Sequence, residues 1–189
     1  MKATRRQLVA AGAGLALGLA GGRVRAEPVL TEDGLYRQPW FLESFLELAD
    51  DLAGAANSGK RFAVLWELRG CPYCRETHLV NFARADIADY IKSNFDVLQL
   101  NIIGSRKVTD FDGAEISEKA LAAKYGVRFT PTVQFFPETP AGLGALAAEK
   151  REVARAPGYL RPDDFLALFR YVREKAYEGK SFREYLKAV

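Results

Sequence analysis

Two closely spaced cysteines are the residues best suited to do chemistry in this sequence. Cys71 and Cys74 are the only cysteines in the 189-residue chain, and Pro72 and Tyr73 lie between them. Disulfide exchange needs an accessible thiolate, a nearby thiol that resolves the mixed disulfide, and surroundings that favour the anion. At the start of a helix, the first sulfur would lie beside unpaired N–H groups at the positive end of the helix dipole. We therefore expect Cys71 to attack substrates and Cys74, which should be less exposed, to resolve the mixed disulfide.

The same spacing also occurs in metal sites. A structural zinc site needs four ligands, whereas this chain offers two cysteines and one histidine, His78. A copper(I) site made of Cys71, Cys74 and His78 stays open, because Cys74 and His78 would share one helix face and thiolates suit Cu(I). That interpretation requires His78 to point at the sulfurs; otherwise His78 is an ordinary helix residue. Our leading interpretation has no metal and no cofactor besides the redox-active Cys71–Cys74 disulfide.

The first 26 residues have the pattern of a removable signal peptide. Lys2, Arg5 and Arg6 precede an apolar stretch from Leu8 to about Ala20, and small residues follow at 24–26. The stretch is shorter than the roughly 20 apolar residues that span a bilayer, so a retained anchor is the weaker alternative. The arginine pair resembles a twin-arginine export signal, and a general secretory signal is the other option. Both predict an exported protein that contacts the membrane only during export.

The charge of the chain depends on this segment. The whole sequence has 27 basic and 24 acidic residues, and residues 1–26 hold five of the basic residues and no acid. Removing them leaves 22 basic against 24 acidic residues, a net charge of −2. The remaining charges are interspersed, without the basic run that would neutralise phosphates. We expect no nucleic-acid partner.

The residues around the cysteines predict a strand followed by a helix. Residues 61–68 form a short apolar run that is typical of a buried strand. Pro72 suits the first turn of a helix, where its missing N–H costs nothing. The helical pattern continues from Tyr73 to about Ser93, with a bend near residues 84–86. Cys71 should therefore lie where a strand gives way to a helix.

The rest of the sequence alternates strands and helices, as in α/β proteins with a mixed sheet. Residues 27–189 are long enough for a single domain with one core. Residues 104–116 are polar, contain two glycines and should form an exposed insertion. We predict an amphipathic N-terminal helix over 39–55, strands over 95–103, 132–136 and 151–156, a helix over 118–125 between Ser117 and Gly126, and a last helix from Pro162.

These segments together resemble the thioredoxin superfamily. The resemblance covers residues 58–172 and rests on the strand ending at Leu68, on Cys71-Pro72-Tyr73-Cys74, and on the stretch 124–132, which reads KYGVRFTPT. It implies a thioredoxin fold, with a central mixed sheet of about four to five strands flanked by helices. It also implies a cis peptide bond before Pro131, next to the cysteines, although Thr130 and Pro131 could be an ordinary strand entry. Thr130 would then pair with an extended substrate strand. Pro131, Pro72 and Tyr73 would be the other substrate-binding residues.

Some positions depart from plain thioredoxins. Those proteins have Trp before the first cysteine and Gly-Pro between the two, where this chain has Gly70 and Pro72-Tyr73. Their buried acid corresponds to Leu65, which cannot relay a proton. Glu67 is the nearest acid, and we expect it to be solvated at the strand end. Cys-Pro-Tyr-Cys is also the glutaredoxin sequence, but no Gly-Gly-x-Asp follows Pro131, so glutathione binding is not expected.

The export signal, the cysteine motif and the insertion before Ser117 resemble the periplasmic SoxW-type thioredoxins of bacterial sulfur-oxidation systems. The resemblance implies a periplasmic thiol:disulfide oxidoreductase that reduces protein disulfides or mixed disulfides, including those of thiol carriers of sulfur oxidation. Its partners would be protein thiol and disulfide substrates. A membrane thiol-electron transporter would be the reductant that returns electrons to the cysteine pair. A disulfide-donating oxidase or an isomerase is the alternative, since the sequence leaves the redox potential open. The last alternative is a protein-binding module whose cysteines take no part in redox chemistry.

Overall fold

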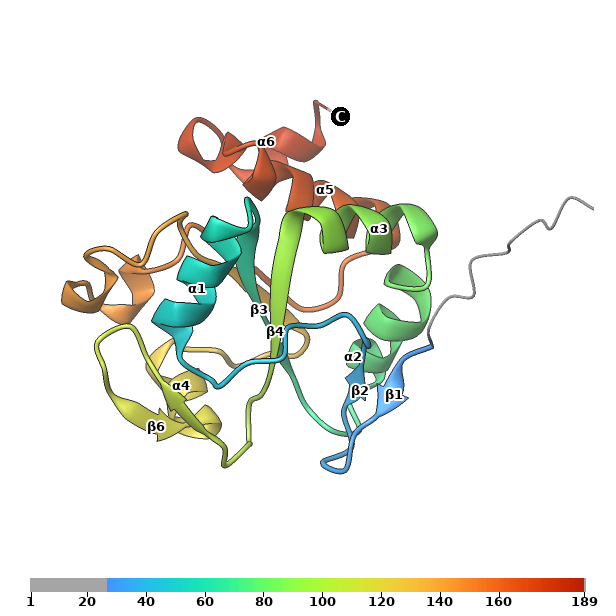
Figure 1. The fold of residues 1–189 in the computed structure, drawn as a ribbon. Coiled ribbons are helices and arrows are strands. Elements are labelled where there is room, and N and C mark those ends of the chain that lie inside the picture. The colour runs from blue at the N-terminus through green and yellow to red at the C-terminus, as the bar shows by residue number, and fades with distance from the viewer. Residues whose placement is uncertain (1–26, 189) are drawn as a thin grey trace, which may run out of the picture.

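A four-stranded mixed sheet forms the centre of the computed structural model, which describes residues 27–188 (Figure 1). β3 runs parallel to β4 and antiparallel to β7, which is itself antiparallel to β8. The order across the sheet is β4 (Phe95–Asn101), β3 (Arg61–Glu67), β7 (Thr132–Phe135) and β8 (Ala154–Pro157). The predicted α/β class with a mixed central sheet is confirmed. The predicted signal peptide, residues 1–26, lies outside the described residues.

Alternation along β3 builds a hydrophobic core on each face of the sheet. Phe62, Val64 and Trp66 pack in the core that contains helices α1 (Leu48–Asn57) and α4 (Glu118–Lys124). Ala63 and Leu65 belong to the core that contains helices α3 (Ala85–Asn94) and α5 (Pro162–Arg173). All seven residues of β3 are buried, as expected for a central strand covered on both faces.

The predicted helix over 39–55 is wrong in its first half. α1 begins only at Leu48, and residues 39–47 follow an irregular path. The Leu42 N–H donates to the carbonyl of Val97 at 2.9 Å, and Leu46 has a φ of 64°, which no α-helix contains. Phe41 is buried in one core while Phe45 is 99% exposed, so the apolar spacing did not reflect one helix face.

The segment before the predicted helix over 39–55 forms a hairpin, which the sequence analysis did not predict. β1 (Val29–Leu30) pairs antiparallel with β2 (Tyr36–Arg37). A tight turn connects them, in which the Gly34 N–H donates to Thr31 O and Gly34 has a φ of 81°. Figure 1 shows this hairpin, in blue, beside α2 (Pro72–Glu76), and the Gln99 side chain of β4 donates to Tyr36 O of β2 at 2.6 Å.

The predicted helix from Tyr73 to Ser93 is interrupted. α2 continues into a π-helical turn, η1 (Thr77–Asn81), and the helical conformation is interrupted before α3 begins. The break falls where the bend was predicted, because Arg84 takes an extended conformation and becomes the residue that precedes α3. The interruption turns α3 onto the sheet, where Ile87 and Ile91 are fully buried.

The predicted insertion, residues 104–116, is a second hairpin with a buried side. β5 (Lys107–Thr109) pairs antiparallel with β6 (Glu115–Ser117). Val108 is buried in the core of α1 and α4, and Asp110 is buried beneath Arg151. The Ser117 side chain accepts the Ala120 N–H, which confirms the predicted cap of α4.

The C-terminal part follows the prediction and adds one element. β8 begins at Ala154, three residues later than predicted, and α5 begins at Pro162 as predicted. The side of α5 that faces the sheet is buried and apolar, with Phe165, Leu168, Phe169 and Val172. A further helix, α6 (Phe182–Leu186), is stabilised by a capping box between Ser181 and Glu184. None of the helices within residues 27–188 has the length and apolar character needed to cross a membrane.

Candidate active site

Cys71 lies at the junction between β3 and α2, as predicted. After β3 ends, Gly70 turns the chain with a φ of 73°, and Cys71 becomes the N-cap residue of α2. Pro72 occupies the first turn of that helix, where a missing N–H breaks no hydrogen bond. The sulfur of Cys71 accepts the backbone N–H of Cys74 at 3.1 Å. Such a hydrogen bond favours the charged form of the sulfur once the cysteine is reduced.

The two cysteines differ in exposure and form a disulfide. Cys71 is bonded to Cys74 in this structure. Cys74 is only 5% exposed, whereas Cys71 is partly exposed. A substrate can therefore reach the Cys71 sulfur but not that of Cys74. This asymmetry matches the expected roles of an attacking and a resolving thiol.

The loop before β7 faces the disulfide and contains the predicted cis bond, between Thr130 and Pro131. The carbonyl oxygen of Thr130 lies 3.5 Å from the Cys71 sulfur. The Pro131 carbonyl accepts the N–H of Gly158, which fixes the loop to the segment that follows β8. Among the described residues, no hydrogen bond uses the Thr130 N–H. Thr130 thus presents a free backbone donor close to the redox pair.

The substrate-binding residues predicted between the cysteines are on the surface. Pro72 is exposed and Tyr73 is 56% exposed. The Tyr73 ring stacks on that of Tyr159, with a centroid distance of 5.9 Å. The structure thus brings Pro72, Tyr73, Thr130 and Pro131 into one region around Cys71.

The β1–β2 hairpin, which sequence analysis missed, forms a wall of the site. A pocket of about 400 Å³ is lined by Leu30, Leu35 and Tyr36 of the hairpin and by both cysteines. The sequence contained a signal for this hairpin: two short apolar pairs flank the turn-forming Thr31-Glu32-Asp33-Gly34. A substrate that approaches the sulfurs from this side meets the hairpin first.

Glu67 is buried, which corrects the prediction of a solvated strand-end glutamate. It is 1% exposed and lines the same pocket as the cysteines. Its two carboxylate oxygens lie 3.1 and 3.0 Å from Nε2 of His78, and one of them also accepts Nε2 of Gln99. A buried carboxylate is stable only when such partners replace water.

His78 does not face the sulfurs. The copper(I) interpretation required that orientation, so it is wrong. The imidazole is buried, with Nε2 on Glu67 and Nδ1 3.2 Å from Nε2 of Gln38. Both ring nitrogens are therefore occupied by protein groups. No cluster of three or more His, Cys, Asp or Glu side chains within residues 27–188 is arranged to hold a metal ion.

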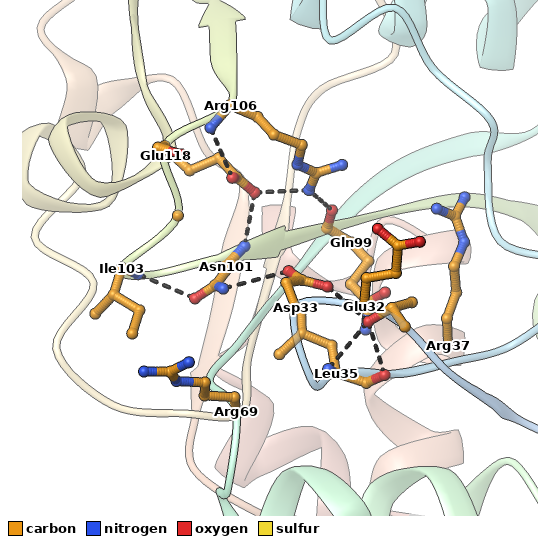
Figure 2. A pocket seen from close by; sticks show the side chains of 13 residues that line it. Glu32, Asp33, Leu35, Arg37, Arg69, Gln99, Asn101, Ile103, Arg106 and Glu118 are labelled. Atoms are coloured by element: carbon orange, nitrogen blue, oxygen red, sulfur yellow. Dashed lines mark hydrogen bonds and ion pairs between the residues drawn. The ribbon is translucent and has the colours of Figure 1, made fainter.

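A second pocket, of about 600 Å³, lies beside the redox turn and is shown in Figure 2. One side is an ordered network: buried Glu118 accepts the Asn101 N–H and the Arg106 guanidinium, and the Asn101 amide donates to Asp33 at 3.4 Å. Arg69, two residues before Cys71, lines the pocket without joining this network. Arg69 therefore forms no ion pair among the described residues, although Glu32 and Asp33 line the same pocket.

The chain matches the model of one protein family over residues 48–173, about two thirds of its length, and that family is the thioredoxin-like domain. The match includes both cysteines, the cis-proline loop and all four strands of the central sheet. No curated protein matches the sequence.

Solved structures resemble this chain to different degrees. A thioredoxin-fold protein from Helicobacter pylori is 24% identical, with a TM-score of 0.53, and the alignment covers 69% of this chain and 84% of that one. A thioredoxin from Thermus thermophilus is 23% identical, with a TM-score of 0.48 and coverage of 65% and 81%. The likeness to the first of these shows that the architecture is the thioredoxin fold.

Proposed function

This chain belongs to the thioredoxin-like domain family, and we propose that it is a periplasmic thiol:disulfide oxidoreductase that reduces protein disulfides or mixed disulfides. One observation carries the proposal: the partly exposed Cys71 sulfur accepts a helix N–H at 3.1 Å and lies 3.5 Å from the Thr130 carbonyl. The backbone thus offers a donor that stabilises the attacking thiolate, beside a loop that can hold a substrate.

The reaction starts from the reduced dithiol. The Cys71 thiolate attacks one sulfur of the substrate disulfide, and the substrate bond breaks as the other sulfur leaves and takes up a proton. The buried Cys74 then loses its proton and attacks the Cys71 sulfur, which releases the second substrate thiol and forms the Cys71–Cys74 disulfide. Two electrons pass to the substrate in total. A dithiol reductant, for which we propose a membrane thiol-electron transporter, returns them.

Glu67 is the candidate acceptor for the proton that Cys74 loses. It is the carboxylate among the described residues that line the pocket of both cysteines. His78 and Gln99 hold its two oxygens in place. Water in the pocket could connect Cys74 to Glu67, because the pocket of about 400 Å³ exceeds the volume of roughly 30 Å³ that a water molecule occupies.

The substrate would bind as an extended strand beside the cis-proline loop. The free N–H of Thr130 provides a backbone donor for such a strand, and Pro131, Pro72 and Tyr73 line its path. The proposed location in the periplasm rests on the export signal in residues 1–26. Thiol carriers of sulfur oxidation are the proposed substrate class, from the resemblance to SoxW-type thioredoxins.

The test of this function is the reduction potential of the Cys71–Cys74 pair together with activity. The protein without residues 1–26 is equilibrated in defined thiol buffers, and its redox state is read by thiol alkylation. A potential near about −270 mV supports a reductase, whereas one near about −120 mV indicates the disulfide-donating oxidase. The variant Cys71→Ser should lose insulin reduction, and Cys74→Ser should accumulate a mixed disulfide with substrate. Full activity of Cys71→Ser would remove Cys71 as the nucleophile.

A further inference from the structure

Three arginines around the redox pair have no ionic partner. Arg69 lies two residues before Cys71, Arg75 lines the pocket that contains both sulfurs, and Arg128 lies two residues before Thr130. All three are exposed, and none of their guanidinium groups forms a hydrogen bond or ion pair within residues 27–188. Their charges therefore extend into solvent at the site of exchange.

Many arginines elsewhere are neutralised by a carboxylate. Five of them have ion pairs of 2.6 to 3.0 Å: Arg37, Arg84, Arg106, Arg151 and Arg155. The acids near the redox pair do not play this part for the three free arginines. Glu67 is buried against His78, and Asp33 accepts from Thr31 and Asn101. Three guanidinium groups without an ion pair among the described residues therefore lie around the redox pair, although residues 27–189 have a net charge of −2.

Large apolar side chains are exposed in the same region. Leu30 is 61% exposed and lines the pocket of the two cysteines, Tyr73 lies between the cysteines at 56%, and Phe129 precedes Thr130 at 66%. Exposed apolar side chains gathered around one site are characteristic of surfaces that contact another protein. We call these three side chains and the three free arginines the redox face.

We propose that the redox face recognises protein substrates in which acidic residues flank an apolar residue near the reactive cysteine. The inference rests on the proposed exchange function and adds the chemical class of its partner. Leu30, Tyr73 and Phe129 would cover the apolar residue, while the free guanidinium groups attract the carboxylates. Complementary charge at the rim of an interface accelerates association more than it slows dissociation.

The test compares two cysteine peptides with the same apolar residues, each carried as a mixed disulfide with a small neutral thiol. Aspartate and glutamate flank the cysteine in one peptide, and lysine and arginine flank it in the other. With the reduced protein at low salt, we expect the acidic peptide to react about tenfold faster, since steering raises association rates by this order. The rate ratio should approach one at high salt, where charges are screened.

Variants then assign the preference to the redox face. The triple variant Arg69→Gln, Arg75→Gln and Arg128→Gln should bring the low-salt ratio close to one. Arg183→Gln is the matched control, because Arg183 is an exposed, unpaired arginine of α6, which lies at the far end of the molecule in Figure 1. It should leave the ratio unchanged. Using the ratio of two peptides cancels any effect of the arginines on the Cys71 thiolate itself.

The neutral compound hydroxyethyl disulfide separates this inference from the function on which it rests. If the wild-type protein reacts with it but shows equal rates for both peptides at low salt, the recognition of acidic substrates is wrong while exchange stands. The same holds if the triple variant keeps the wild-type ratio. If none of the three disulfides reacts, the oxidoreductase function fails, and the inference fails with it.

Discussion

At the scale of single residues, the Cys71 sulfur meets two backbone groups with opposite preferences. The Cys74 N–H, at 3.1 Å, stabilises a thiolate, whereas the Thr130 carbonyl, at 3.5 Å, can only accept a hydrogen bond from the thiol form. The balance between these groups determines how strongly the reduced state is favoured, and therefore whether the pair reduces or oxidises its partners. Both groups belong to the backbone, so substitutions of neighbouring side chains alter this balance only indirectly.

Glu67 is the residue whose environment departs most from expectation, and its burial yields a stability prediction. The variant Glu67→Ala leaves the buried donors of His78 and Gln99 without their acceptor. We expect the free energy of unfolding to fall by about 3 kcal/mol, since each orphaned buried polar group costs about 1–3 kcal/mol. Urea unfolding of the oxidised protein measures it. A loss below about 1 kcal/mol would show that water replaces the carboxylate.

At the scale of elements, the two hairpins serve different purposes. The β1–β2 hairpin forms a wall of the cysteine pocket, whereas the β5–β6 hairpin is anchored on the other side of the sheet by charged groups. Between β5 and β6, Asp110 binds Arg151 at 2.7 Å, and Asp112 binds Lys124 at 2.5 Å and Arg151 at 3.0 Å. The Tyr125 hydroxyl donates to Asp110 within the same network.

This network predicts a specific dependence of stability on pH. The Lys124 ammonium, and then the Arg151 guanidinium, hold the pKa of the Asp112 carboxyl well below its ordinary value of 3.8. Because the folded-state pKa is lowered, the stabilisation is complete above the ordinary value and diminishes as the pH falls below it. The wild type should therefore lose more stability than Asp112→Asn between about pH 5 and pH 2.

Urea midpoints at the two ends of this pH range measure the effect. Asp89→Asn is the control, because Asp89 is exposed on α3 without a partner among the described residues. Its pH dependence should follow the wild type. Identical pH profiles for the wild type and Asp112→Asn would show that Asp112 does not stabilise the hairpin.

Elements with local signals were predicted correctly, and those determined by distant contacts were not. The Ser117 cap of α4, the Pro162 start of α5 and the redox turn all depend on neighbouring residues. The irregular path of residues 39–47 depends on a bond from Leu42 to Val97, 55 positions away. The burial of Glu67 likewise depends on His78 and Gln99 meeting at its carboxylate, with Gln38 on the other ring nitrogen of His78. Pairings between such distant polar residues leave no periodic pattern in one sequence.

At the scale of the whole molecule, β3 joins the two cores into one unit. Its residues alternate between the core of α1 and α4 and the core of α3 and α5, so neither core can lose its packing while the other remains intact. The two tryptophans of the chain report on different cores. Trp66 is buried in the first and donates to Gln134 at 2.9 Å, whereas Trp40 packs against the second.

Unfolding should therefore be a single cooperative transition. In Trp40→Phe the remaining fluorescence reports the core around Trp66, and in Trp66→Phe it reports the core around Trp40. Within each variant we expect the fluorescence and far-ultraviolet circular dichroism curves in urea to coincide, as two-state unfolding requires. A fluorescence midpoint that precedes the dichroism midpoint in either variant would show that one core melts first.

The position of the β1–β2 hairpin also has a practical consequence for handling the protein. The hairpin forms one wall of the cysteine pocket, so a tag or fusion partner joined just before Glu27 would stand only three residues before Leu30, which lines that pocket. The other end of the described chain, after α6, lies on the opposite side of the molecule (Figure 1). Affinity tags, fluorophores and surface attachment belong at the C-terminal end, where they leave the approach to the disulfide open.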